Sequence, residues 1–344
     1  MSDIPSNIII SRTDSIGDVV LTLPVATVLK RHFPGIKIAF IGKNYTKPVI
    51  ESCTSIDLFI DVNDFISTEI TIFGEKPAAI IHVLPVPKIA RRAAQLAIPL
   101  RIGTTNRFYH WFTCNSLVKL SRKKSRLHEA QLNLKLLEPL GITGDLSLED
   151  IGSSFALNAT QPLPEKFAAM VDKRKYNLIL HPKSQGSGRE WGLENFIQLI
   201  GMLEPDRFKI FISGIEKERK LLEPIFNEVA DKVTDITGRM NLTEFISFIK
   251  ACDGLIASGT GPIHLAAALG KDALGIYPPI KPIHPGRWAP LGPNAKAFAV
   301  NKLCTDCKAD KTSCHCIHEV NPVRLKDALY NSVEKRAEYR GGEF

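Results

Sequence analysis

The 344-residue chain has no apolar stretch that could cross a bilayer as a helix, because Pro or Lys interrupts its longest apolar runs. The opening residues, Met1 to Asn7, lack the basic start and apolar run of a secretory signal peptide. With 44% hydrophobic and 23% charged residues, the composition does not indicate disorder, collagen or coiled coil. We therefore expect a cytoplasmic globular protein, and its length suits two domains.

Two common phosphate-binding fingerprints are also missing. No G-x-x-x-x-G-K-[S/T] loop is present, and no G-x-G-x-x-G follows the first strand that we expect. The second absence argues against a nicotinamide-dependent dehydrogenase.

Positive charge is in excess, with a formal net charge of +8. A basic surface favours anionic partners such as nucleic acid, an anionic membrane face or phosphorylated substrates. Scattered lysines are typical of an ordinary solvated surface, whereas the cluster from Arg122 to Arg126 is denser. The first half also contains Arg91, Arg92, Arg101 and Arg107.

Strand and helix patterns alternate twice along the chain. In the first half, we expect strands at 7–11, 36–41, 56–62 and 78–84, and helices at 17–32 and 128–140. The region 144–166 has little periodicity. The alternation then resumes with strands at 176–181, 208–213, 255–258 and 273–277, and helices at 193–203, 217–229, 242–251, 263–269 and 321–340. This pattern predicts an α/β protein with two doubly wound, Rossmann-like domains, whose ligands bind at the carboxyl ends of the strands.

The first strand-to-helix turn, Arg12 to Asp18, combines small and acidic residues. Asp14 and Ser15 are typical helix-capping residues. Asp18 has two interpretations: an acid that complements the helix dipole, or a carboxylate placed to accept a proton. Spacing alone favours the first.

Two turns in the second half suit an anion. The loop His181 to Trp191 offers backbone N–H groups together with cations, although its Arg189 is also compatible with a surface position. The turn Ser258-Gly259-Thr260-Gly261-Pro262 lets the backbone approach a ligand at the start of a helix. His264 follows in the first helical turn, where a packed side chain and a diphosphate contact are equally compatible with the pattern.

Four of the seven cysteines fall in one short segment as C-x2-C and C-x-C: Cys304, Cys307, Cys314 and Cys316. Two alternatives remain open for them. They hold a structural zinc ion, or they are reduced thiols or a redox-sensitive pair.

Three stretches together resemble glycosyltransferase family 9, the ADP-heptose:lipopolysaccharide heptosyltransferases. They are SRTDSIGDVVLTLPVATVLKRHFPG, LILHPKSQGSGREWGLENF and LIASGTGPIHLAAALG. The resemblance implies a GT-B fold of two Rossmann-like domains. It places an acceptor-binding domain at 1–155, a nucleotide-sugar-binding domain at 156–320, and a tail helix within 321–344 that crosses back to the first domain. It also implies an inverting transfer without a catalytic metal or other required cofactor.

The resemblance carries roles to individual residues. Asp18 would be the general base, and Arg189 would offset charge on the leaving nucleoside diphosphate. The donor would be bound by Ser184, Glu218, Met240, Thr260, Gly261 and His264. A phosphorylated, lipid-linked and membrane-embedded acceptor would meet Arg91, Arg92, Arg101 and Arg107, together with the cluster from Arg122 to Arg126.

The chain departs from the family pattern at Gly259, where characterised heptosyltransferases usually have an aspartate that contacts the donor sugar. The expected partners are a nucleotide-diphosphate sugar such as ADP-heptose, an anionic glycan acceptor and the cytoplasmic face of the inner membrane, with no nucleic acid. Another activated sugar remains open as donor. The alternatives are a nucleotide-sugar 2-epimerase with the same fold, or a non-catalytic nucleotide-sugar-binding protein.

Overall fold

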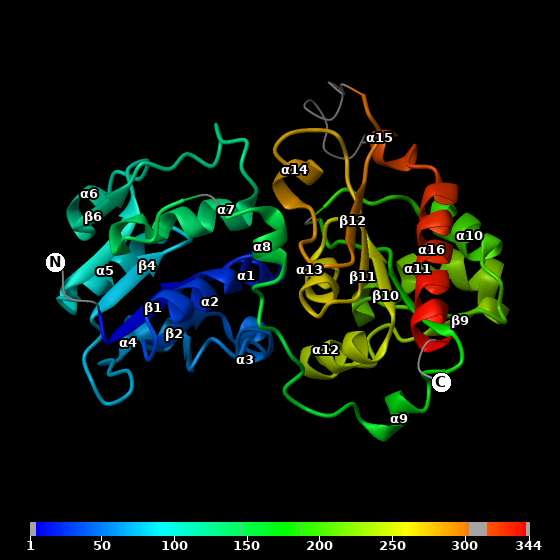
Figure 1. The fold of residues 1–344 in the computed structure, drawn as a ribbon, viewed down its shortest axis with the longest axis horizontal. Coiled ribbons are helices and arrows are strands. Elements are labelled where there is room, and N and C mark those ends of the chain that lie inside the picture. Colours follow the sequence, from blue (N-terminus) through cyan, green and yellow to red (C-terminus); the bar gives the residue numbers. More distant parts are fainter. Residues whose placement is uncertain (1–4, 145, 187, 303–314, 342–344) are drawn as a thin grey trace. The chain divides into compact units, whose positions relative to one another are not determined.

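The computed structural model of the protein describes residues 5–144, 146–186, 188–302 and 315–341. The chain divides into two compact units, Met1–Thr160 and Gln161–Phe344. Each unit is a parallel six-stranded sheet with helices packed on it, which confirms the expected α/β class (Figure 1).

The first sheet has the strand order β3-β2-β1-β4-β5-β6. Its strands are β1 (Asn7–Ser11), β2 (Lys37–Gly42), β3 (Leu58–Asp61), β4 (Ala79–His82), β5 (Leu100–Thr104) and β6 (Ser116–Val118). The helices of this unit are α1 (Ile16–Val20), α2 (Leu23–His32), α3 (Lys47–Glu51), α4 (Val62–Ser67), α5 (Pro87–Gln95), α6 (His110–Thr113), α7 (Glu129–Leu134) and α8 (Leu148–Gly152), with 3-10 turns at η1 (Asn44–Thr46) and η2 (Lys135–Leu140).

The second sheet has the order β12-β11-β10-β7-β8-β9. Its strands are β7 (Tyr176–His181), β8 (Phe208–Ile212), β9 (Val233–Asp235), β10 (Gly254–Ala257), β11 (Asp272–Ile276) and β12 (Ala295–Phe298). The helices are α9 (Glu165–Ala168), α10 (Leu193–Met202), α11 (Arg219–Val229), α12 (Leu242–Ala251), α13 (Gly261–Ala268), α14 (Pro285–Trp288), α15 (His315–His318) and α16 (Pro322–Gly341), with 3-10 turns at η3 (Glu216–Glu218) and η4 (Ala230–Lys232).

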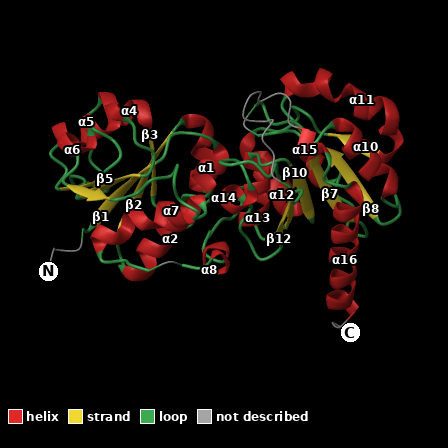
Figure 2. Ribbon diagram, turned by 90° about the horizontal axis from the view of Figure 1, so that it is seen from above, coloured by secondary structure: helices red, strands yellow, loops and turns green. Residues whose placement is uncertain are grey.

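Both sheets are buried between helices. Figure 2 shows α4 and α5 on one face of the first sheet and α2 and α7 on the other. The central strands β1 and β7 are mostly apolar, as parallel strands covered on both faces must be. Among the described residues, no helix combines the length and the apolarity that a membrane span needs.

The two sheets repeat one topology. In each, the chain moves outward from the first strand to one edge and then returns to build the other half. The direction reverses between β1 and β4 in the first unit and between β7 and β10 in the second. Ligands of doubly wound folds bind outside the carboxyl ends of strands at such a reversal. The turns after β1, β7 and β10 therefore lie where a ligand is expected.

The final helix, α16, packs within the second unit. Leu325 and Leu329 are fully buried in its core cluster beside α10. The predicted crossing of this helix to the first domain concerns the relation between the units and stays a prediction.

Candidate functional site

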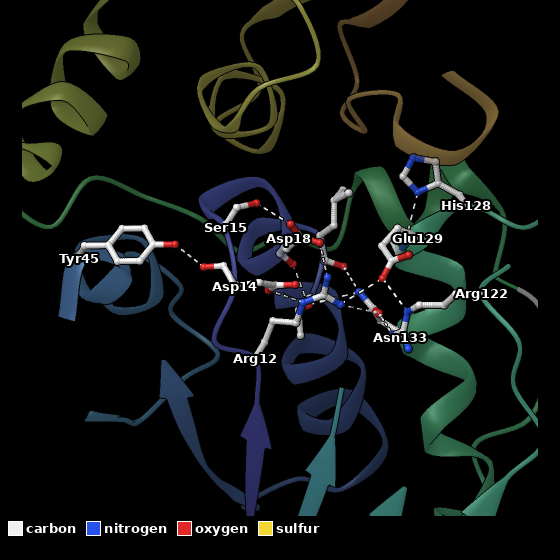
Figure 3. A network of polar contacts seen from close by, with 12 residues as sticks. Arg12, Asp14, Ser15, Asp18, Tyr45, Arg122, His128, Glu129 and Asn133 are labelled. Carbon is white, nitrogen blue, oxygen red and sulfur yellow. Dashed lines mark hydrogen bonds and ion pairs between the residues drawn. The ribbon is translucent and has the colours of Figure 1, made fainter. Parts of the chain in front are cut away.

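A network of charged side chains surrounds Arg12, the first residue after β1 (Figure 3). The Arg12 Nε donates to Asp14 Oδ1 at 2.7 Å, and Nη2 is paired with Asp18 Oδ1. The Ser15 hydroxyl donates to the other carboxylate oxygen of Asp18. Ser15 does occupy the N-cap of α1, but its hydroxyl makes no capping bond to the helix backbone. Both oxygens of Asp18 are therefore held by side chains of the turn that precedes it.

The other side of Arg12 faces α7. Its Nη1 donates to Glu129 Oε1 at 3.1 Å, and Arg122 Nε donates to the same oxygen at 2.9 Å. Arg122 Nη2 also donates to Asn133 Oδ1 at 2.9 Å, and the Asn133 amide donates to the Leu21 carbonyl at 3.0 Å. These contacts join α7 to Arg12 through Glu129 and to the end of α1 through Asn133.

Burial and the neighbouring charges both shift the pKa values in this network. Burial alone would lower the pKa of Arg12, but the carboxylates of Asp18, Asp14 and Glu129 outweigh it and the pKa is raised. Burial also raises the pKa of Asp14, against the opposing effect of Arg12. Arg12 is therefore a permanent cation on which several carboxylates converge.

Asp18 differs from Glu129 in its access to solvent. The side chain of Glu129 is 1% exposed, whereas that of Asp18 is 18% exposed. Asp18 belongs to the first turn of α1, and its carboxylate is both oriented and reachable. This arrangement suits a group that accepts a proton from a bound hydroxyl, provided that the hydroxyl lies within hydrogen-bond reach.

In the second unit, the loop after β7 packs against the turn after β10. The Trp191 backbone N–H donates to the Ser258 hydroxyl at 3.2 Å, and a Cβ at Gly188 would lie 3.0 Å from the Ser258 carbonyl oxygen. Ser184 is buried, and both its N–H and its hydroxyl donate to Glu190 Oε1, at 3.0 and 3.2 Å. The two predicted anion turns therefore form one surface at the strand reversal between β7 and β10.

At this surface, Arg189 Nε and Thr260 Oγ1 are buried without a partner in the described part of the chain. Native structures leave few such atoms unpaired, and a site that binds a ligand or an ion is one reason for an exception. Thr260 is also the N-cap of α13, yet its side chain makes no capping bond. The first N–H groups of that helix follow at Gly261, so cationic, hydroxyl and N–H donors are present together.

Gly259 has a left-handed φ of +43°, and a Cβ there would lie 3.0 Å from Cε1 of Tyr277. Both the backbone and the buried Tyr277 ring therefore disfavour a side chain at this position. The Tyr277 ring thus occupies the space beside the position where the sequence departs from the family's aspartate.

The remaining predicted donor residues follow other strands of the same sheet. Glu218 lies after β8, is 4% exposed, and accepts the Ile215 N–H at 2.9 Å. Met240 is partly exposed and directly precedes Asn241, the N-cap of α12. His264 is 3% exposed in α13.

Two of the arginines predicted to meet the acceptor, Arg101 and Arg107, differ from each other. Arg101 Nε donates to the Thr113 carbonyl at 2.8 Å, and its Nη1 donates to the Ile98 carbonyl. These bonds give Arg101 a structural role between β5 and α6. Arg107 is exposed.

The cysteine segment is described only in part, because Cys304, Cys307 and Cys314 lie outside the described residues. Cys316 is buried in α15. In the described ranges no cluster of three His, Cys, Asp or Glu side chains is suited to a metal ion.

Sequence reasoning assigned no role to Arg12, Glu129 or Asn133. Arg12 and Glu129 are 117 residues apart, so their ion pair leaves no local pattern to find. The one usable signal was the position of Arg12, directly at the carboxyl end of a buried strand.

The chain is similar to several known proteins in sequence and in fold. The family model of glycosyltransferase family 9 (heptosyltransferase) matches residues 89–318. A Haemophilus influenzae protein described as a glycosyltransferase is 24% identical over 308 residues, 85% of this chain and 88% of its own. The structure of a family 9 glycosyl transferase from Veillonella parvula superposes with a TM-score of 0.79 at 18% identity, over 96% of this chain and 97% of that one. The E. coli heptosyltransferase WaaC, solved with ADP, gives a TM-score of 0.70 at 17% identity, over 95% and 99% of the two chains. Since the family model matches well over half of the sequence, the chain belongs to glycosyltransferase family 9, the heptosyltransferase family.

Proposed function

We propose that this protein is an inverting, metal-independent transferase acting on a lipopolysaccharide core or a related cell-envelope glycan. It takes a sugar, expected to be heptose, from a nucleotide-diphosphate donor, expected to be ADP-heptose. The similar E. coli enzyme WaaC was solved with ADP, which supports an adenine nucleotide here. The proposal includes a cytoplasmic location with peripheral contact to the inner membrane.

The observation that carries the proposal is the pair of buried donors, Arg189 Nε and Thr260 Oγ1, that lack partners beside the Gly259 turn. A guanidinium, a hydroxyl and helix N–H groups together suit a diphosphate. The donor set would be completed by Ser184, Glu218, Met240, Gly261 and His264. Arg107 and the exposed cations of the cluster from Arg122 to Arg126 would meet the acceptor.

The proposed chemistry uses the carboxylate of Asp18 and the guanidinium of Arg189. Asp18 accepts the proton of the acceptor hydroxyl as its oxygen forms a bond to the anomeric carbon. The bond from that carbon to the diphosphate breaks, and Arg189 stabilises the negative charge on the departing nucleoside diphosphate. Attack from the face opposite the leaving group inverts the anomeric configuration.

Turnover of a nucleotide-sugar panel with a lipid A–core extract tests the proposal. We expect transfer from an ADP-sugar, and Asp18→Asn should slow it by about 10² to 10⁴ while leaving ADP affinity unchanged. The matched control is Asp14→Asn, which removes another carboxylate paired with Arg12. Nucleotide binding without transfer from any donor would favour a non-catalytic binding protein, and equal losses in the two variants would remove the base role from Asp18.

A further inference from the structure

Three large aromatic side chains stand exposed on and beside α6. Phe108 is 80% exposed, Phe112 73% and Trp111 60%. The Phe108 and Phe112 rings pack edge to face, with centroids 5.1 Å apart. Soluble proteins rarely group large apolar side chains on their surface unless the group binds something. We call these three residues the aromatic patch.

The patch is held in place from below. His110, on the same helical turn, is fully buried, and the Thr104 backbone N–H donates to its Nδ1 at 2.9 Å. Gly103 permits this approach, because a Cβ there would lie 2.6 Å from His110 Nδ1. The Trp111 indole N–H donates to the Thr105 carbonyl at 3.0 Å. The helix thus turns a histidine inward and its aromatic rings outward, the reverse of an ordinary surface helix.

The sequence around the patch has no negative charge. Between Glu75 and Glu129, residues 76–128 contain no Asp or Glu but eleven Lys and Arg, more than the whole chain's formal net charge of +8. Arg107 directly precedes the patch and is exposed. Helix α5 packs against α6 (Figure 2). Its Lys88 and Arg91 are exposed. We call residues 76–128 the acid-free segment.

We propose that the aromatic patch, with Lys88, Arg91 and Arg107, docks this protein onto an anionic lipid bilayer. Aromatic rings lie at the headgroup level of membranes, and nearby cations add attraction to anionic lipids. A second copy of this chain is a poorer occupant, because a symmetric contact would bring two acid-free segments together. The inference rests on the peripheral membrane contact proposed above and names the surface that makes it.

Vesicle co-sedimentation without donor or acceptor tests the inference, so that its failure leaves the proposed sugar transfer untouched. We expect binding to phosphatidylcholine vesicles that contain phosphatidylglycerol and little binding to phosphatidylcholine alone. The triple variant F108A/W111A/F112A should bind at least about tenfold more weakly. The control L148A/L221A/V323A, which trims three exposed apolar side chains elsewhere, should bind like wild type.

Charge reversal supplies an independent arm. K88E/R91E/R107E should weaken binding by at least about 100-fold, because each lost cation removes on the order of fivefold and each new carboxylate adds repulsion from the anionic surface. The control K220E/K296E/K335E makes the same charge change at three exposed lysines outside the acid-free segment. Equal loss in both charge variants would show a net-charge effect and overturn the assignment.

Tryptophan fluorescence reports the patch directly. Of the three tryptophans, Trp191 is fully buried, Trp288 is partly buried outside the acid-free segment, and Trp111 is largely exposed. Anionic vesicles should therefore shift the emission to the blue, and Trp111→Phe should abolish the shift. An unshifted wild-type emission would overturn the proposal. Wild-type vesicle binding by F108A/W111A/F112A would overturn it too. So would a variant that loses a dimer seen for the wild type in sedimentation velocity, or that loses binding of single-stranded RNA, because the patch would then serve another partner.

Discussion

The Nη1 of Arg12 donates to Oε1 of Glu129 at 3.1 Å, although 117 residues separate them in the sequence. This bond joins the end of β1 to the start of α7, and Arg122 donates to the same carboxylate. The base proposed for catalysis, Asp18, is thus oriented by an arginine that is itself oriented by a buried glutamate.

Glu129→Gln should therefore lower both stability and turnover. Removing one partner of a buried ion pair leaves the other charge uncompensated, so we expect the free energy of unfolding to fall by about 3 kcal/mol. Turnover should fall because Arg12 loses a contact that positions it against Asp18. Urea denaturation and initial rates measure the two effects. Glu138→Gln, at a 45% exposed side chain paired with Lys135 at 3.6 Å, is the control, and a rate loss no larger than in this control would contradict the positioning role.

Arg189→Met should weaken nucleotide binding without destabilising the free protein. Nε of Arg189 is buried without a partner, so its removal costs the unliganded protein no hydrogen bond. Bonds from a charged donor contribute about 1.5–3 kcal/mol each, which predicts an ADP dissociation constant raised about 10- to 150-fold. Calorimetric titration and thermal melts measure binding and stability. Arg174→Met, at an 88% exposed arginine, should change neither, and a lowered melting temperature for Arg189→Met would point to a structural role instead.

His82 should make the first unit sensitive to acid. Burial, followed by the nearby His110 and Arg101, lowers its pKa from 6.5 to about 3. Between these values the unfolded chain binds a proton that the folded chain refuses, so stability falls as the pH falls. His82→Met removes this contribution, and between pH 7 and pH 5 it should lose about 2 kcal/mol less unfolding free energy than wild type. Denaturant titrations at both pH values measure the difference, and parallel losses would show that His82 is not the responsible group.

Arg336→Met should loosen α16. The Arg336 guanidinium pairs with the Asp253 carboxylate, donates to the Asp253 carbonyl at 2.9 Å and lies 5.0 Å from the Tyr176 ring centroid. We expect the free energy of unfolding of the second unit to fall by about 2 kcal/mol. Amide hydrogen exchange should quicken in α16 before other helices. Lys335→Met, on the adjacent exposed lysine, is the control, and unchanged exchange in Arg336→Met would remove the anchoring role.

The sequence predicted the central strands better than the outer ones. The runs at 7–11 and 176–181 are mostly apolar and coincide with β1 and β7. The strands β6 and β9 are only three residues long and partly exposed, and β5 includes Arg101, so none has a clear pattern. The expected helix 17–32 is two helices, because the first ends before Leu21 and Thr22, and α2 then starts at Leu23 with Pro24 in its first turn.

The site was predictable only where its signal is local. The glycines and the proline of the turn at 258–262 predict a helix start, and α13 does begin within this turn. The partners of Asp18 come from α7 and from the segment before it, so only the folded sheet brings them together. The sequence pattern also does not predict that the Tyr277 ring fills the space beside Gly259, because Gly259 follows β10 and Tyr277 follows β11.

The tail helix has a consequence for synthesis on the ribosome. Every strand of the first sheet precedes residue 119, so that unit holds all its sheet partners long before the chain is finished. The second unit differs, since Leu325 and Leu329 complete its core only after the last strand is made. Domains generally fold in the order in which they emerge. The amino-terminal unit can therefore fold while translation continues, whereas a nascent chain arrested before residue 322 exposes an open apolar face beside α10 to chaperones and proteases.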